Sequence, residues 1–136
     1  MKFIRYIPIF ALPLILYNAL VFSSQEELTI ILNYDLFGPI NLISGAVLVV
    51  DVKGLLLIIS LFLLFLEIVK ATRTSEAQVL DHAMSMLIFV IYLVEFIVVA
   101  KCGTMTFVIL TVMSLTDVIA GFTVSLSTAR RDIAIG

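Results

Sequence analysis

Four long apolar segments limit what this chain can fold into. They cover residues 4–22, 54–69, 83–100 and 105–126. A helix needs about 20 apolar residues to cross the hydrocarbon layer of a membrane, and these segments are close to that length. Of the 136 residues, 62% are hydrophobic and 13% are charged, whereas a soluble domain carries about 25% charged residues. The sequence therefore predicts an all-α membrane protein, in which one integral domain forms an antiparallel bundle of four transmembrane helices.

The first apolar segment resembles a signal peptide at its start. Lys2 and Arg5 form a basic end, and an apolar run follows them. The run is longer than the hydrophobic region of an ordinary signal peptide. We therefore expect an uncleaved transmembrane helix, kinked by Pro8 and Pro13, because proline removes a backbone donor that the helix would use.

The links between the apolar segments differ in kind. Residues 101–104 are too few for anything except a tight turn, so the last two helices should form an antiparallel hairpin. Residues 24–53 form a longer link, which we expect to be an interfacial segment in the first outer loop. Within it, residues 26–36 have the spacing of a short amphipathic helix. Residues 40–50 are apolar and too short to span, which fits an interfacial or re-entrant segment, or two short strands.

The basic residues predict the orientation of the bundle. With four spans, six basic residues share one side, and only Lys53 and Lys101 lie on the other; the six are Lys2, Arg5, Lys70, Arg73, Arg130 and Arg131. Basic residues accumulate on the cytoplasmic side of membrane proteins. We therefore expect both termini in the cytoplasm and the chain in a plasma membrane, most simply a bacterial inner membrane.

The predicted spans carry polar side chains that are costly at that depth. Asp117 lies near the middle of the last apolar segment, where a carboxylate costs about 2.5–3.5 kcal/mol on insertion scales. Together with Ser114 on the same helix, and Tyr92 and Glu95 on the preceding one, it forms a candidate intramembrane polar or ion-binding site. The alternative is a hydrogen-bonded contact between helices, with Tyr92 or a serine as the partner of Asp117.

A second predicted cluster lies at the cytoplasmic end of the bundle. It contains Glu67, Lys70, Asp81 and His82. Lys70 follows Glu67 by three residues, a spacing at which helical side chains can pair. One histidine beside one carboxylate is too small a ligand set for a metal, so Asp81 is better interpreted as an acid near the positive end of a helix dipole.

Gly121 and Ser125 form a small-xxx-small pair, which lets membrane helices pack closely, either within one chain or between chains. Cys102 is the single cysteine and excludes an internal disulfide; it is either a free thiol or a bridge between chains.

The sequence contains no catalytic motif, and we expect no enzymatic activity, no cofactor and no bound metal. A net charge of −2 argues against a nucleic-acid partner. The expected partners are the lipid bilayer and either further copies of the chain or a larger membrane complex. Our first hypothesis is a structural, accessory or self-assembling subunit of such a complex. The alternative is a proton- or cation-linked transport or channel subunit that uses the intramembrane carboxylates.

Overall fold

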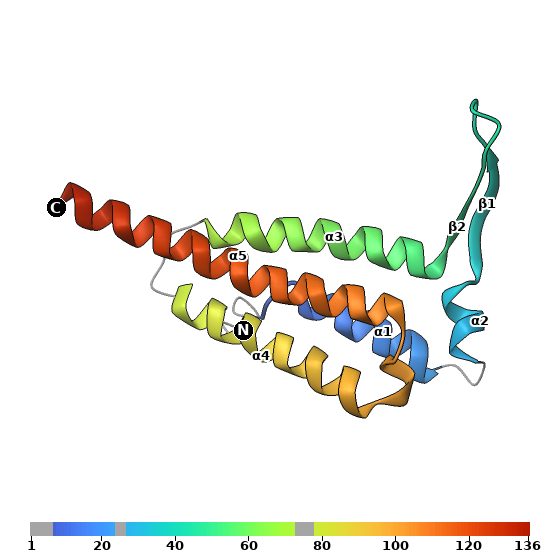
Figure 1. Cartoon of the computed structure of the whole chain (residues 1–136), viewed down its shortest axis with the longest axis horizontal. Helices are drawn as coiled ribbons and strands as arrows, with labels where there is room; N and C mark the ends of the chain where they lie inside the picture. Colours follow the sequence, from blue (N-terminus) through green and yellow to red (C-terminus); the bar gives the residue numbers. More distant parts are fainter. Residues whose placement is uncertain (1–6, 24–26, 73–77) are drawn as a thin grey trace.

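The computed structural model describes residues 7–23, 27–72 and 78–136 and shows a helical bundle with a β-hairpin at one end (Figure 1). In chain order the elements are α1 (Ala11–Ser23), α2 (Leu28–Leu32), β1 (Asp35–Asn41), β2 (Val47–Asp51), α3 (Val52–Ala71), α4 (Gln78–Val98), the 3-10 turn η2 (Ala100–Cys102) and α5 (Met105–Ile135). Helix α5 packs against both α3 and α4, and α1 contacts α3 and α5.

Among the described residues, three helices are long and apolar enough to cross a membrane, which indicates a membrane protein. They are α3, α4 from Val79 onwards, and α5. The predicted fourth span is not confirmed, because the first helix has 13 residues and is therefore only about 20 Å long. It begins after Pro8, whose carbonyl accepts a hydrogen bond from the Ala11 N–H at 3.0 Å. The predicted start of this span at residue 4 lies outside the described residues.

The spanning helices differ from the predicted segments mainly at their ends. Helix α3 begins at Val52 because the carboxylate of Asp51 caps it by accepting a hydrogen bond from the Gly54 N–H. Helix α4 begins five residues before the predicted start at residue 83, and its first turn contains Asp81. Helix α5 continues to Ile135, well past the predicted end at residue 126. Beyond residue 126 the helix carries the exposed residues Ser127, Arg130 and Arg131, so a prediction from hydropathy does not detect this part.

The predicted all-α class needs a correction, because the outer segment contains two strands. The short helix α2 lies within the range of the predicted amphipathic helix, and an antiparallel β-hairpin follows it. At Gly38, with φ of 136°, an added Cβ would lie 3.2 Å from the Leu48 carbonyl oxygen, so a larger residue would strain the strand pairing. The chain is thus mostly helical with one hairpin. The predicted start of the outer segment at residue 24 lies outside the described residues.

An aromatic layer forms the centre of the bundle. It consists of four fully buried rings from or beside three helices, Phe10, Tyr17, Tyr92 and Phe107. The ring centroids of Tyr17 and Phe107 are 4.8 Å apart, those of Tyr92 and Phe107 5.5 Å, and those of Phe10 and Tyr92 5.9 Å. These distances lie in the range of favourable aromatic packing. Many apolar side chains outside this core point outward from the helices, as expected of a surface that lipid covers.

Candidate functional site

The first polar cluster joins the end of α3 to α4 and to the residues before α1. The Lys70 ammonium lies 3.1 Å from Glu67 Oε1 and 3.7 Å from Asp81 Oδ1. Glu67 is buried, and its Oε2 accepts a hydrogen bond from the Ile9 N–H at 2.8 Å. Ile9 lies two residues before the start of α1, where backbone N–H groups have no partner within the helix. Glu67 thus satisfies two donors from different parts of the chain.

Asp117 belongs to this first polar cluster. Its carboxylate is buried and interacts with the Ser85 hydroxyl and with the charges of Glu67 and Lys70. The structure therefore places Asp117 with the predicted cytoplasmic-end residues, and its partner is a serine rather than Tyr92. Lys70 therefore forms ion pairs with Glu67 and Asp81 and interacts through its charge with Asp117. Within the described part of the chain, Asp81 Oδ1 is buried without a hydrogen-bond partner.

His82 pairs with α5. Its Nε2 forms a hydrogen bond with the hydroxyl of Ser125, which also donates to the Gly121 carbonyl at 2.9 Å. A Cβ at Gly121 would lie 2.8 Å from His82 Cε1 and 2.9 Å from His82 Nδ1. The glycine therefore lets the histidine ring lie against the backbone of α5. Gly121 and Ser125, predicted as packing residues, make this contact within one chain.

The second polar cluster lies at the opposite end of α4. Asn18 of α1 donates a hydrogen bond to Glu95 Oε2 at 2.8 Å, and the Cys102 thiol lies 3.9 Å from the same oxygen. Nearby, the Tyr17 hydroxyl bonds to Thr104 Oγ1 at 2.7 Å and donates to the Lys101 carbonyl at 3.1 Å. Lys101 donates to the Val21 carbonyl at 3.3 Å. These contacts tie the end of α1 to the turn between α4 and α5.

Cys102 is shielded at this end of the bundle. It is fully buried in the turn η2. Burial, together with the neighbouring Glu95 carboxylate, raises the pKa of the thiol to about 11. Because the thiolate is the reactive form, this position favours an unreactive free thiol over a bridge between chains.

Tyr92 and Ser114 lie in the interior between the two clusters. The Tyr92 ring packs between Phe10 and Phe107, and its hydroxyl lies 3.5 Å from the Phe10 carbonyl oxygen. Ser114 is buried on α5, between the level of Phe107 and that of Asp117. The predicted set of Asp117, Glu95, Tyr92 and Ser114 is therefore distributed along the bundle. Asp117 lies in the first cluster, Glu95 lies in the second, and the aromatic layer separates them.

Two participants were absent from the predicted sites. Ser85 is the partner of Asp117, and Asn18 is the partner of Glu95. Asn18 is a single amide in the apolar residues 4–22, and a polar side chain in such a segment is itself a signal of an interhelical contact. Among the described residues, no group of three or more His, Cys, Asp or Glu side chains is placed to hold a metal ion.

The chain matches no known family model, no curated protein and no solved structure.

Proposed function

We propose that this chain is a non-catalytic structural subunit of a membrane complex, formed with a larger membrane protein or with further copies of itself. The observation that carries the proposal is the pairing of the carboxylates within the helices. Glu67 forms a hydrogen bond with Ile9 and Glu95 with Asn18, and Asp117 interacts with the Ser85 hydroxyl. Each pair joins two different parts of the bundle, as a packing device would.

The aromatic layer also supports a structural role. Along α4, Ser85 of the first polar cluster and Glu95 of the second lie on either side of Tyr92. The Tyr92 ring is fully buried against Phe10 and Phe107. A conduction path needs polar groups or water along its length. The packed rings around Tyr92 therefore argue against a conduction path through the interior of a single chain.

The proposal includes the topology expected from the charges. In it, α1 and the residues before it complete a fourth crossing, and both termini lie in the cytoplasm of a bacterial cell. Contacts at both ends of α1 support this arrangement. The Ile9 N–H bonds to Glu67 near the end of α3, and the Val21 carbonyl bonds to Lys101 beyond the end of α4. The segment thus extends between the two polar clusters.

The native mass of the complex, extracted gently from its own membranes, tests the structural role. We expect co-extraction with another membrane protein at fixed stoichiometry, or a single species at a multiple of 15.0 kDa. Asp117→Asn should keep this assembly, because an amide can still bond to Ser85. Asp117→Leu should weaken it, because the leucine leaves the serine without that partner. Recovery of a monomer alone, or loss of assembly in the asparagine variant, would contradict the proposal.

A second function, proton- or cation-linked transport, is favoured by one observation. Lys70 forms ion pairs with Glu67 and Asp81 and interacts through its charge with Asp117, and an excess of carboxylates within a membrane is typical of ion-binding sites. In this case Asp117→Asn should abolish pH-dependent flux in proteoliposomes while leaving assembly intact. Unchanged flux in that variant would remove the transport hypothesis and leave the structural one.

A further inference from the structure

The β-hairpin has one face without polar side chains. Residues paired across an antiparallel sheet point to the same side, and neighbours along a strand point to opposite sides. Phe37 pairs with Val50, and Ile40 pairs with Leu48; these four residues form what we call the apolar face. The opposite face carries Asp35 paired with Asp51, Asn41 paired with Val47, and Val49.

Three of the four residues of the apolar face are exposed in the described chain, and Val50, beside the base, is partly buried. Phe37 is 63% exposed and Leu48 is 47% exposed, and Ile43 at the hairpin tip is fully exposed. Residues 36–50 contain no charged side chain. An isolated two-stranded hairpin is only marginally stable in water. We therefore expect a lipid layer or another molecule to cover the apolar face and remove it from water.

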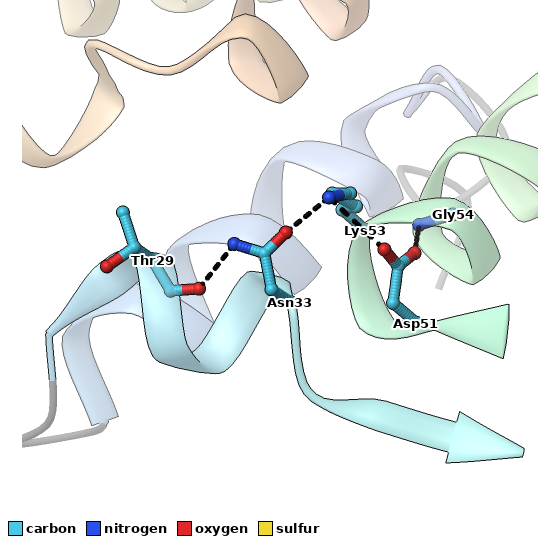
Figure 2. A network of polar contacts seen from close by, with 5 residues as sticks. All are labelled: Thr29, Asn33, Asp51, Lys53 and Gly54. Atoms are coloured by element: carbon cyan, nitrogen blue, oxygen red, sulfur yellow. Dashed lines mark hydrogen bonds and ion pairs between the residues drawn. The ribbon is translucent and has the colours of Figure 1, made fainter. Parts of the chain in front are cut away.

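Contacts at the base fix the direction of the hairpin (Figure 2). Lys53 bonds to the side-chain oxygen of Asn33 and lies 3.2 Å from Asp51 Oδ2. Asn33 donates to the Thr29 carbonyl at 2.7 Å, and the Val52 N–H donates to the Tyr34 carbonyl at 3.0 Å. These bonds tie α2, both strands and the start of α3 together. The hairpin they hold extends across the direction of the helices (Figure 1).

The length of α3 sets the level of the hairpin relative to a membrane. Its 20 residues span about 30 Å, which is the thickness of the hydrocarbon layer. Since α3 begins at Val52, directly after β2, the hairpin lies at the hydrocarbon boundary. The apolar face of the hairpin then lies at the same membrane depth as the first turns of α3, where the lipid-facing surface of that helix ends. The outer strand edges carry backbone groups that hydrocarbon cannot satisfy, so the hairpin belongs among the headgroups.

We propose that this hairpin is a lipid-binding element that lies along the membrane surface. Phe37, Ile40 and Leu48 contact the acyl chains just below the headgroups, and the face with Asn41 and Val49 is turned to water. The occupant of the apolar face is thus the lipid surface beside α3. This role is independent of the proposed structural function and holds for either function of the bundle.

Tryptophan fluorescence tests the proposal, because the chain contains no tryptophan of its own. Leu48→Trp and Val49→Trp are matched variants, since the two residues are neighbours in β2 and point to opposite faces. Each variant is placed in vesicles of phosphatidylcholine with and without brominated acyl chains. We expect Leu48→Trp to emit at shorter wavelength and lose intensity with brominated lipid. Val49→Trp should instead be quenched by aqueous iodide.

The outcomes distinguish lipid from other occupants. Equal iodide quenching of both variants would overturn the proposal, since the apolar face would then be in water. Protection of Leu48→Trp from both quenchers, increasing with the protein-to-lipid ratio, would overturn it in favour of a second copy of the chain. Phe37→Trp on the other strand repeats the test if the β2 variants fail to incorporate, and bromolipid quenching there would support the proposal.

Discussion

At the scale of single residues, the small side chains of α5 decide how closely α4 can approach. The ring of His82 lies so close to Gly121 that a Cβ at residue 121 would be only 2.8 Å from the Cε1 atom of the histidine. The bond between His82 and Ser125 holds the ring in that position. Gly121 is therefore required by the contact with α4, although glycine disfavours a helix by about 1 kcal/mol relative to alanine.

This contact predicts that the effect of Gly121→Ala on the free energy of unfolding changes sign when His82 is removed. Gly121→Ala should lower the free energy of unfolding in detergent by about 1–2 kcal/mol, because overpacking outweighs the gain in helix propensity. In a His82→Ala background the same substitution should raise that free energy by up to about 1 kcal/mol, since only the propensity term remains. A double-mutant cycle on urea unfolding measures both. An equal loss in the two backgrounds would show that His82 does not set the requirement for glycine.

At the scale of elements, polar side chains cap the first turns of α3 and α5 and so set where these two helices begin. Asp51 caps α3 through the Gly54 N–H at 2.8 Å, and Thr104 caps α5 through the Phe107 N–H at 3.2 Å. Thr104 also bonds to Tyr17 of α1, and Lys53, which pairs with Asp51 in the first turn of α3, bonds to Asn33 at the end of α2. The caps therefore position neighbouring elements as well as the helix starts.

The cap of α3 predicts a dependence of stability on pH. Partial burial favours the neutral acid, but the Gly54 N–H and the Lys53 ammonium outweigh it and lower the pKa of Asp51. A lowered pKa in the folded state stabilises the fold above the unfolded pKa of about 3.9, and this contribution is lost as the pH falls through the folded value. Asp51→Ala should cost about 1 kcal/mol at neutral pH.

The matched control is Asp51→Asn, which keeps an oxygen acceptor for the cap but does not titrate. Urea unfolding in detergent at neutral pH and in acid measures the difference between each variant and the wild type. We expect the cost of Asp51→Ala to shrink in acid, where the wild-type cap is protonated. A cost that is independent of pH would assign the effect to side-chain packing and not to the ionised cap.

The sequence predicted the elements better than their partners. Hydropathy located α3, α4 and α5, because crossing a membrane requires long apolar runs. The described part of the first helix begins at Ala11, after Pro8, and its predicted start at residue 4 lies outside the described residues. The sequence left open whether Tyr92 or a serine is the partner of Asp117, because the choice depends on the rotation of each helix about its axis. Such rotations come from the packing of all the helices together, and spacing along one helix does not define them.

At the scale of the whole molecule, the two ends of the bundle differ in chemistry. One end holds the first polar cluster around Lys70, and the polar last turns of α5 extend from it with Arg130 and Arg131. The other end holds the Asn18–Glu95 pair and the hairpin, whose residues 36–50 carry no charged side chain. Since basic residues stay on the cytoplasmic side, the end with the first cluster is the one that we expect to face the cytoplasm.

This asymmetry gives a prediction that separates three crossings from four. Reporters that are active only in the cytoplasm are fused before Met1, after Gly136 and, as a control, within the hairpin tip at Gly45. With α1 crossing as part of a fourth span, both terminal fusions should be active and the fusion at Gly45 inactive. The physical reason is that six basic residues then share the cytoplasmic side, against two outside. An active fusion at Gly136 with an inactive one at Met1 would instead mean three crossings, with α1 packed against the bundle without spanning.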